Sequence, residues 1–339
     1  MTETPTSKLP GLFLIGTIAA LSTVVAQHPT LTALKISPLV VGILLGVVLG
    51  NTIRAKIPEA CDEGIIFSAK RLLKLAIILY GFRITFTQIG DLGLNGLLLD
   101  LLMVGTTLGL GSFVGIRLLG MDKPTAIMTA AGSAICGAAA VVATEPIVKA
   151  ENHQTAAAVA TVVVFGTLSM FLYPLAYRAG WIPMDAELFG VYIGASIHGV
   201  AHVVAAGEAV GASTASTAVI VKVTRVLMLA PTLIIVGLLL NRRAKNADGS
   251  KPKFDIPWFA IGFIGVAGFN SLDLLSAEVV DGLITIDKFL LTMAMSALGI
   301  NTVTSKFKGM GLGPLYLATI LYVWLIGGGY VLTQWLMAS

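Results

Sequence analysis

The chain has 339 residues, of which 56% are hydrophobic and 12% are charged, with a formal net charge of +4 and a mean hydropathy of +0.90. Soluble domains carry about 25% charged residues, so this composition excludes a large soluble enzyme. It indicates an integral membrane protein whose first partner is the lipid bilayer. The basic residues do not gather with aromatic residues into one face, which argues against nucleic acid as a partner.

Eleven apolar runs are long enough to cross a hydrocarbon core about 30 Å thick. They lie at residues 10–26, 38–53, 65–82, 95–118, 124–148, 154–178, 187–207, 214–240, 256–275, 287–304 and 312–337. The sequence therefore predicts an all-α membrane protein with about eleven transmembrane helices, forming a single membrane domain over residues 1–339.

The loops between these runs differ in basic charge, and cytoplasmic loops are enriched in Lys and Arg. One set of loops holds thirteen such residues: Lys8, Arg54, Lys56, Arg117, Lys123, Arg178, Arg242, Arg243, Lys245, Lys251, Lys253, Lys306 and Lys308. The alternate set holds four: Lys35, Arg83, Lys149 and Lys288. We therefore expect a multi-pass protein of the inner membrane with a cytoplasmic N-terminus and an external C-terminus.

Two stretches rich in small residues resemble each other at a constant offset of 62. Residues 132–143 read GSAICGAAAVVA and residues 194–205 read GASIHGVAHVVA, with seven of twelve positions identical. Small residues around glycines allow a membrane helix to break, and broken helices bind solutes near the middle of the bilayer. The rest of the chain is expected to be built around these two breaks. If both stretches cross the membrane fully, however, the charge bias makes them parallel.

A weaker match joins two more distant parts of the chain. Residues 81–99 resemble residues 299–317 at an offset of 218, and the spans that they follow run in opposite directions. This predicts inverted repeats, with a first half at 38–178, a second half at 187–337 and a polar cytoplasmic loop at 241–255. Discontinuous helices are expected to break near residues 133–137 and 299–302.

Lys222 and Arg225 lie about nine and twelve residues into an apolar run, close to the centre of the bilayer. Residues three apart share a helix face, and each buried cation costs at least about 2.5 kcal/mol there. One interpretation is a binding site for an anion, assisted by the positive N-terminal ends of broken helices. The structural alternative pairs the cations with helix carbonyls or with a buried acid such as Asp100 or Glu145.

His198 and His202 share a helix face through their i,i+4 spacing. Cys136 occupies the position equivalent to His198 in the earlier stretch, which raises the alternative of an intramembrane metal-dependent enzyme. Two histidines are a poor zinc signal, so no metal or other cofactor is expected. Protonation or hydrogen bonding to a substrate is favoured, because histidine titrates near physiological pH.

Further polar residues complete the candidate substrate site. They stand at the expected breaks or inside apolar spans, where they otherwise serve to join helices: Ser133, Cys136, Gly137, Asn270, Asn301 and Thr302. Three acids, Glu278, Asp281 and Asp287, are expected in a solvated outer loop with no function assigned.

Several motifs together resemble a largely uncharacterised family of bacterial inner-membrane proteins, UPF0324, described as sulfate exporters. They are GSAICGAAAV, FGTLSMFLYP, SIHGVAHVVAAG, VIVKVTRVLMLAP, IPWFAIGF and FLLTMAMSALGIN. The resemblance implies a secondary transporter whose fold is similar to that of sodium/proton antiporters and bile acid symporters. Such proteins have a panel domain and a core domain in which two broken helices cross.

The chain departs from that family pattern at one motif. An acidic residue commonly follows the motif histidine and a glutamine stands four residues after it, where this chain has Gly199 and His202. Coupling through an acid at this position is therefore in doubt, or it has moved to a histidine.

The leading functional prediction is a secondary transporter of small anions, such as sulfate, sulfite or sulfonates, rather than an enzyme. A passive anion channel and the metal-dependent enzyme are the alternatives. No G-x-x-x-x-G-K-[ST] motif occurs in the sequence, which disfavours an ATP-driven pump. The expected partners are the small anion, a coupling proton or sodium ion and, as a possible assembly, a second copy of the chain.

Overall fold

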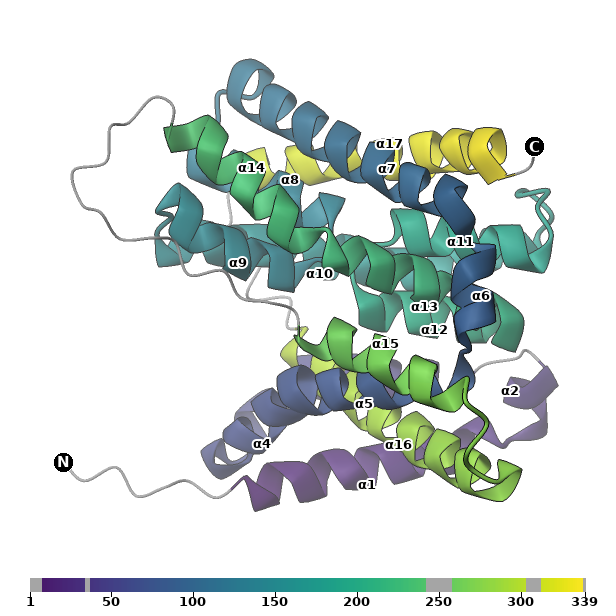
Figure 1. The fold of residues 1–339 in the computed structure, drawn as a ribbon. Helices are drawn as coiled ribbons and strands as arrows, with labels where there is room; N and C mark the ends of the chain where they lie inside the picture. The colour runs from purple at the N-terminus through teal and green to yellow at the C-terminus, as the bar shows by residue number, and fades with distance from the viewer. Residues whose placement is uncertain (1–7, 34–36, 242–257, 303–311, 338–339) are drawn as a thin grey trace. The chain divides into compact units, whose positions relative to one another are not determined.

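The computed structural model describes residues 8–33, 37–241, 258–302 and 312–337, and within them the chain is built from helices. Figure 1 follows these helices along the chain. Six of them are long and apolar enough to cross a membrane: Leu9–Ala26, Gly93–Leu118, His153–Arg178, Ala212–Leu240, Ala277–Asn301 and Leu312–Met337. The all-helical membrane architecture predicted from the sequence is thus confirmed. The loop expected at 241–255 lies almost entirely outside the described residues.

The helices form two compact units. The first comprises residues 1–89 and 259–306, and the second comprises residues 90–258 and 307–339. The two units interleave along the sequence, whereas the halves 38–178 and 187–337 divide it once and remain a prediction.

The first unit is organised around the long helix α16 (Ala277–Asn301). α16 packs against α3 (Pro38–Thr52), α1 (Leu9–Ala26) and α5 (Leu73–Tyr80). Its remaining elements are α2 (Pro29–Ala33), η1 (Arg54–Lys56), η2 (Glu59–Cys61), α4 (Asp62–Phe67), η3 (Ser68–Leu72), η4 (Gly81–Arg83) and α15 (Trp258–Asn270), while α6 (Phe86–Asp91) joins the units.

Glycines spaced four apart let α3 and α16 approach closely. A Cβ added at Gly46 would lie 3.0 Å from the Cα of Gly299, and one added at Gly42 would lie 2.7 Å from Oγ of Ser296. Small residues at such spacing bring helix backbones together in membranes. α16 runs through Gly299 and ends at Asn301, within the range 299–302 where a helix break is expected, and that break remains a prediction. The residues that follow, 303–311, lie outside the described part of the chain.

The sequence predicted Asp287 in a solvated acidic loop, and this prediction is wrong. Asp287 is a wholly buried residue of α16, and its Oδ2 is 2.7 Å from Nη2 of Arg83 in η4. Glu278 and Asp281, in the first turns of the same helix, are exposed. A buried carboxylate needs a cation or hydrogen-bond donors beside it, and Arg83 from a distant part of the chain supplies the cation.

The second unit contains the helix breaks expected in the two similar stretches, 132–143 and 194–205. Its elements are α7 (Gly93–Phe113), η5 (Val114–Leu118), α8 (Lys123–Ala134), α9 (Ala138–Val148), α10 (Asn152–Arg178), α11 (Ala186–Ser196), α12 (Val200–Val210), α13 (Ala212–Leu227), α14 (Leu229–Asn241) and α17 (Leu312–Met337). Residues 135–137 separate α8 from α9, and residues 197–199 separate α11 from α12. The 62-residue offset therefore relates the two breaks residue for residue.

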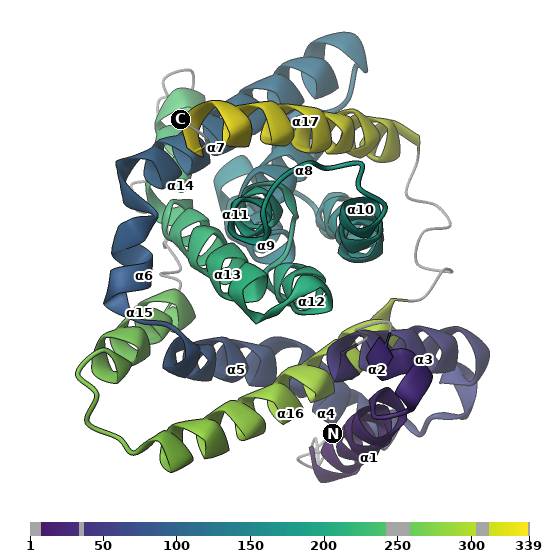
Figure 2. The ribbon, with the colours of Figure 1, turned by 90° about the vertical axis from the view of Figure 1, so that its right-hand side faces the viewer.

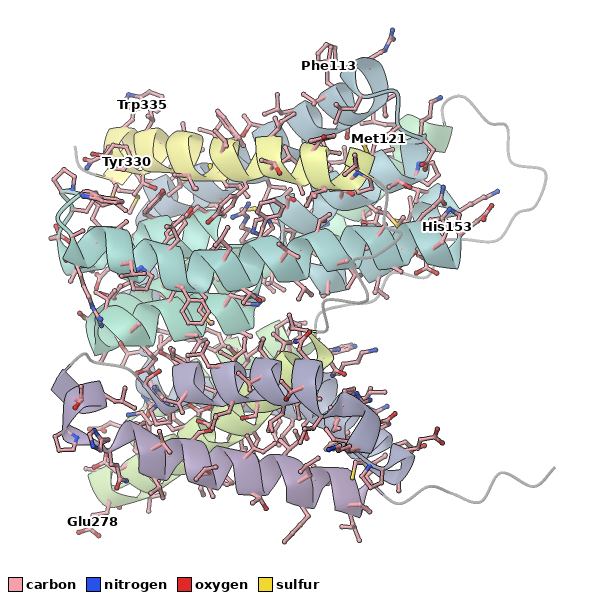
Figure 3. The ribbon with its side chains drawn as sticks, turned by 180° about the vertical axis from the view of Figure 1, so that it is seen from behind. Phe113, Met121, His153, Glu278, Tyr330 and Trp335 are labelled. Atoms are coloured by element: carbon pink, nitrogen blue, oxygen red, sulfur yellow. The ribbon has the colours of Figure 1, made fainter. Side chains whose placement is uncertain are left out.

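Neither broken segment crosses the unit, because each reverses at its break. In the first hairpin (α8–α9), Met128 of α8 lies beside Thr155 of α10, and Gly132 lies beside Val162. α8 and α10 therefore run in the same direction, so α9 returns to the end where α8 began. Figure 3 shows Met121, just before α8, and His153, at the start of α10, at that same end, with Tyr330 and Trp335 of α17 at the opposite end.

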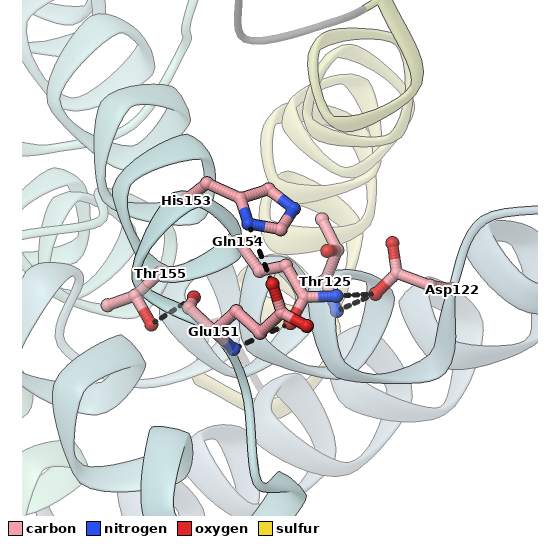
Figure 4. A network of polar contacts seen from close by, with 6 residues as sticks. All are labelled: Asp122, Thr125, Glu151, His153, Gln154 and Thr155. Atoms are coloured by element: carbon pink, nitrogen blue, oxygen red, sulfur yellow. Dashed lines mark hydrogen bonds and ion pairs between the residues drawn. The ribbon is translucent and has the colours of Figure 1, made fainter.

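A polar network closes the base of the first hairpin (Figure 4). Oδ1 of Asp122 accepts from the N–H of Thr125 at 2.8 Å, which caps α8. The same oxygen accepts from Nε2 of Gln154 at 2.8 Å, while Oε1 of Gln154 accepts from the N–H of Glu151. One carboxylate thus holds together the start of α8 and the start of α10.

The second hairpin (α11–α12) reverses in the same way at the other end of α10. Oγ1 of Thr214 in α13 donates to the carbonyl of Ala186 at 2.9 Å, and Gly194 lies beside Ala218 and Val221. α11 and α13 therefore run in the same direction, and α12 returns beside α13 and α10. At the last turn of α10, Nη2 of Arg178 donates to the carbonyl of Ala209 near the end of α12.

The two hairpins consequently enter the unit from opposite ends and meet at their tips. A Cβ added at Gly137 would lie 3.5 Å from the carbonyl oxygen of His198 and 3.7 Å from the Cα of Gly199. Figure 2 shows α8 to α13 gathered beside α17 and α7. Two of the eleven expected spans, 124–148 and 187–207, therefore do not cross. The two similar stretches were expected to be parallel only if both crossed the membrane fully. Because each reverses at its break and they enter from opposite ends, that expectation no longer applies.

The reversals leave the charge bias as it was. With the hairpins reversed, Lys149 belongs to the set of loops rich in basic residues, and Arg178 belongs to the alternate set. The ratio of thirteen to four is unchanged, and the orientation with a cytoplasmic N-terminus remains a prediction.

Cysteine labelling tests the first reversal directly. In a background with Cys61 and Cys136 replaced by alanine, cysteines at Lys123 and at His153 should react with an impermeant reagent from the same side. A cysteine at Trp181, which is exposed beyond the end of α10, should react only from the other side. Labelling of positions 123 and 153 from opposite sides would show that α8–α9 crosses the membrane.

Candidate substrate site at the hairpin tips

The tips bring four helix ends together inside the second unit. α8 and α11 end there with carbonyls that have no partner in their own helix, and α9 and α12 begin there with free N–H groups. The N-terminal residues before α9 and α12 are Gly137 and Gly199, so neither start has a side-chain cap. Gly137 has φ +79°, a conformation that favours glycine. Two partially negative and two partially positive ends therefore face one region.

Lys222 and Arg225 of α13 bind the two negative ends. Nζ of Lys222 donates to the carbonyl of Ile197 at 2.6 Å. Nε of Arg225 donates to the carbonyl of Ala134 at 2.5 Å, and its Nη1 donates to the carbonyl of Ala195. Both side chains are fully buried. Arg225 thus bridges the last turns of α8 and α11.

These contacts correspond to the structural alternative of the sequence analysis, in which buried cations satisfy helix carbonyls. Cations stabilise the C-terminal ends of helices, so the contacts account for two charges in the membrane interior. They do not use every donor, because Nη2 of Arg225 has no hydrogen-bond partner among the described residues. Direct binding of an anion by this pair remains a prediction.

Ser133, His198 and His202 present buried polar groups around the tips. Oγ of Ser133, both ring nitrogens of His198 and Nδ1 of His202 have no hydrogen-bond partner in the described part of the chain. The Nε2 of His202 lies 3.5 Å from Oγ1 of Thr167 in α10. Because buried polar groups are normally hydrogen-bonded, this cluster is suited to a polar ligand.

Aromatic side chains line the same region. The ring of His198 lies 6.4 Å from the ring of Phe165 in α10 and 6.2 Å from that of Tyr322 in α17, centroid to centroid. Phe165 and Tyr322 are themselves 5.0 Å apart. The imidazole of His198 thus packs against both rings, and this packing restricts its orientation.

Asp100 of α7 is a charged group of this region to which the sequence analysis gave only the role of a partner. It is fully buried, and among the described residues neither carboxylate oxygen has a hydrogen-bond partner. Arg225 and Lys222 are the charges that act on it. An ionisable residue inside a transmembrane helix is itself a signal of function, so the apolar run 95–118 already pointed to this position.

The predicted site residues fall into two groups. Those of the second unit gather at or beside the tips: Ser133, Cys136, Gly137, His198, His202, Lys222 and Arg225. Cys136 is buried and interacts electrostatically with Lys222 and Arg225. Within the described residues, no three or more His, Cys, Asp or Glu side chains form a group that could hold a metal ion.

The other predicted site residues, Asn270, Asn301 and Thr302, belong to the first unit. Nδ2 of Asn270 donates to the carbonyl of Ile84 at 3.2 Å, and the carbonyl of Thr302 accepts from Nδ2 of Asn51 at 2.9 Å. These contacts connect segments of that unit, and a role of the three residues in substrate binding remains a prediction.

The fold and the tips define a multi-pass membrane protein with two re-entrant hairpins. A family model described as conserved hypothetical protein 698 matches residues 10–318. A UPF0324 membrane protein of Bacteroides thetaiotaomicron is 45% identical, over 97% of this chain and 98% of that protein. The UPF0324 inner membrane protein YeiH of Escherichia coli K12 is 48% identical, over 95% of this chain and 92% of that protein. The chain belongs to this UPF0324 family, as its motifs indicated.

Among solved structures, the chain is similar to the sodium proton antiporter MjNhaP1 of Methanocaldococcus jannaschii. The match has 14% identity and a TM-score of 0.33, and it covers 95% of this chain and 100% of that one. A TM-score this low does not establish a shared fold.

Proposed function

We propose that the protein is a secondary transporter of small anions in the inner membrane, which binds its substrate at the hairpin tips and releases it by alternating access. The observation that carries this proposal is the meeting of two helix breaks between hairpins that enter from opposite ends. Non-helical backbone is tolerated at membrane depth only inside protein or beside a water-filled cavity. Transporters place substrates at such breaks.

The charges at the tips favour an anion. Lys222 and Arg225 occupy the negative ends of α8 and α11, which leaves the positive ends of α9 and α12 to act on a ligand. Helix N-termini bind anions through their N–H groups and their dipole. Ser133 and His198 add side-chain hydrogen-bonding groups. The family resemblance directs the choice of anion to sulfur oxyanions and sulfonates.

Anion binding is tested by thermal unfolding of the purified protein with sulfate, sulfite, thiosulfate, methanesulfonate and carboxylates, since a ligand that binds the folded state stabilises it. Ser133→Ala and His198→Gln should each lower the affinity for whichever anion stabilises the wild type by about tenfold or more. That figure follows from the roughly 1.5–3 kcal/mol of a hydrogen bond to a charged group.

His153→Gln is the matched control, because His153 is exposed at the base of the first hairpin. Equal affinities in all three variants would contradict a site at the tips. Saturable uptake into proteoliposomes should accompany binding. Non-saturating currents would indicate a channel instead.

A further inference from the structure

Asp100 lies in the second turn of α7, inside the apolar segment Gly93–Leu118. It is 0% exposed, and within the described residues both oxygens of its carboxylate lack a hydrogen-bond donor. A buried carboxylate without hydrogen bonds is costly in its charged form. Lys222 and Arg225 stabilise the charged form of the carboxylate. Whether Asp100 is ionised therefore depends on any other negative charge that lies near these two cations.

The helices packed against α7 add no other buried charge to this environment. α13 contributes Lys222 and Arg225. The remaining charged residues of the packed elements α8, η5 and α11 stand exposed near helix ends: Lys123, Arg117 and Glu187. The buried charges are therefore two cations and one carboxylate, and the titratable side chains of Cys136, His198 and His202 also face these cations.

We propose that Asp100 takes up one proton when a doubly charged anion binds at the hairpin tips. With Asp100 ionised the cluster carries one net positive charge, which a monoanion neutralises. A dianion would leave a net negative charge in a medium of low dielectric, where unneutralised charge is costly. A proton on Asp100 restores neutrality, because the cluster then carries two positive charges. This inference rests on the proposed anion transport and adds its coupling ion.

The test counts protons during anion binding. Isothermal titration calorimetry of the wild type, repeated in buffers of different ionisation enthalpy, should show about one proton taken up per sulfate and none per methanesulfonate. Sulfate affinity should fall about tenfold for each unit rise in pH, as linkage to one proton requires. Methanesulfonate affinity should not change with pH.

Asp100→Asn should bind sulfate without proton uptake and without pH dependence, while Asp100→Glu should keep both. If Asp100 only held Lys222 and Arg225 in position, its substitution would not change the number of protons taken up per sulfate bound. Sulfate binding without proton uptake in the wild type, or uptake that persists in Asp100→Asn, would overturn the assignment. The wild-type count tests whether a proton is coupled to sulfate binding, and Asp100→Asn tests whether Asp100 takes it up. Asp100→Ala is a second variant for that assignment if Asp100→Asn does not fold. If neither anion binds, the transporter proposal fails and this one fails with it.

Discussion

Arg225→Met should lower the stability of the protein more than the loss of any exposed cation. The substitution keeps the length of the side chain but removes the donors to the carbonyls of Ala134 and Ala195. Each buried carbonyl left without a partner costs about 1–3 kcal/mol, and removing one member of a buried charged cluster costs about 3–5 kcal/mol. The free energy of unfolding should therefore fall by about 3–5 kcal/mol, which is seen as a lower melting temperature in detergent.

Lys222→Met should cost less, because Lys222 donates one hydrogen bond, to Ile197. Arg117→Met, at an exposed cation of η5, is the control and should melt like the wild type. A normally stable Arg225→Met protein that has lost anion binding would restore the other interpretation, in which Arg225 holds the substrate and not the helix ends.

Gly299→Val should disrupt the first unit through the crossing of α3 and α16. A Cβ at Gly299 would lie 2.8 Å from the backbone nitrogen of Val47 and 2.9 Å from the Cα of Gly46. Overpacking costs about 1–3 kcal/mol where side chains can move, and here the obstacle is backbone. A loss of at least about 3 kcal/mol is expected, seen as a lower melting temperature and aggregation during size-exclusion chromatography.

Gly282→Val, in the same helix, is the matched control. A Cβ at Gly282 meets nothing within 4 Å, so this variant should behave like the wild type. Similar melting temperatures for the two valine variants would mean that α3 and α16 do not approach as closely as described.

The helix breaks could be predicted because they follow local residue chemistry. Ile135–Cys136–Gly137 and Ile197–His198–Gly199 stand at equivalent positions of the two similar stretches, and both fall between helices. The reversals could not be predicted in the same way. A 25-residue apolar run has the same hydropathy whether it crosses once or turns back, and the contact between Asp122 and Gln154 joins positions 32 residues apart.

For the charged residues, too, the position could be predicted from the sequence but the partners could not. The position of Lys222 and Arg225 in the sequence marked them as important, but their hydrogen-bond partners lie 25 to 91 residues away. Asp287 was misassigned because its partner, Arg83, is 204 residues distant. The spacing of Gly42, Gly46 and Gly50 is visible in the sequence, but it does not identify Gly299 as the residue that Gly46 approaches.

The short legs of the hairpins also constrain how the protein is made. α8 has 12 residues and α11 has 11, so each is about 16–18 Å long, which is roughly half of the hydrocarbon thickness. Neither leg can be integrated into the bilayer by itself, and each exposes unsatisfied carbonyls at its tip. Arg225, which binds both tips, is synthesised after both hairpins. Completion of the membrane core must therefore wait until α13 has left the ribosome, although the first hairpin ends at Val148, 77 residues before Arg225.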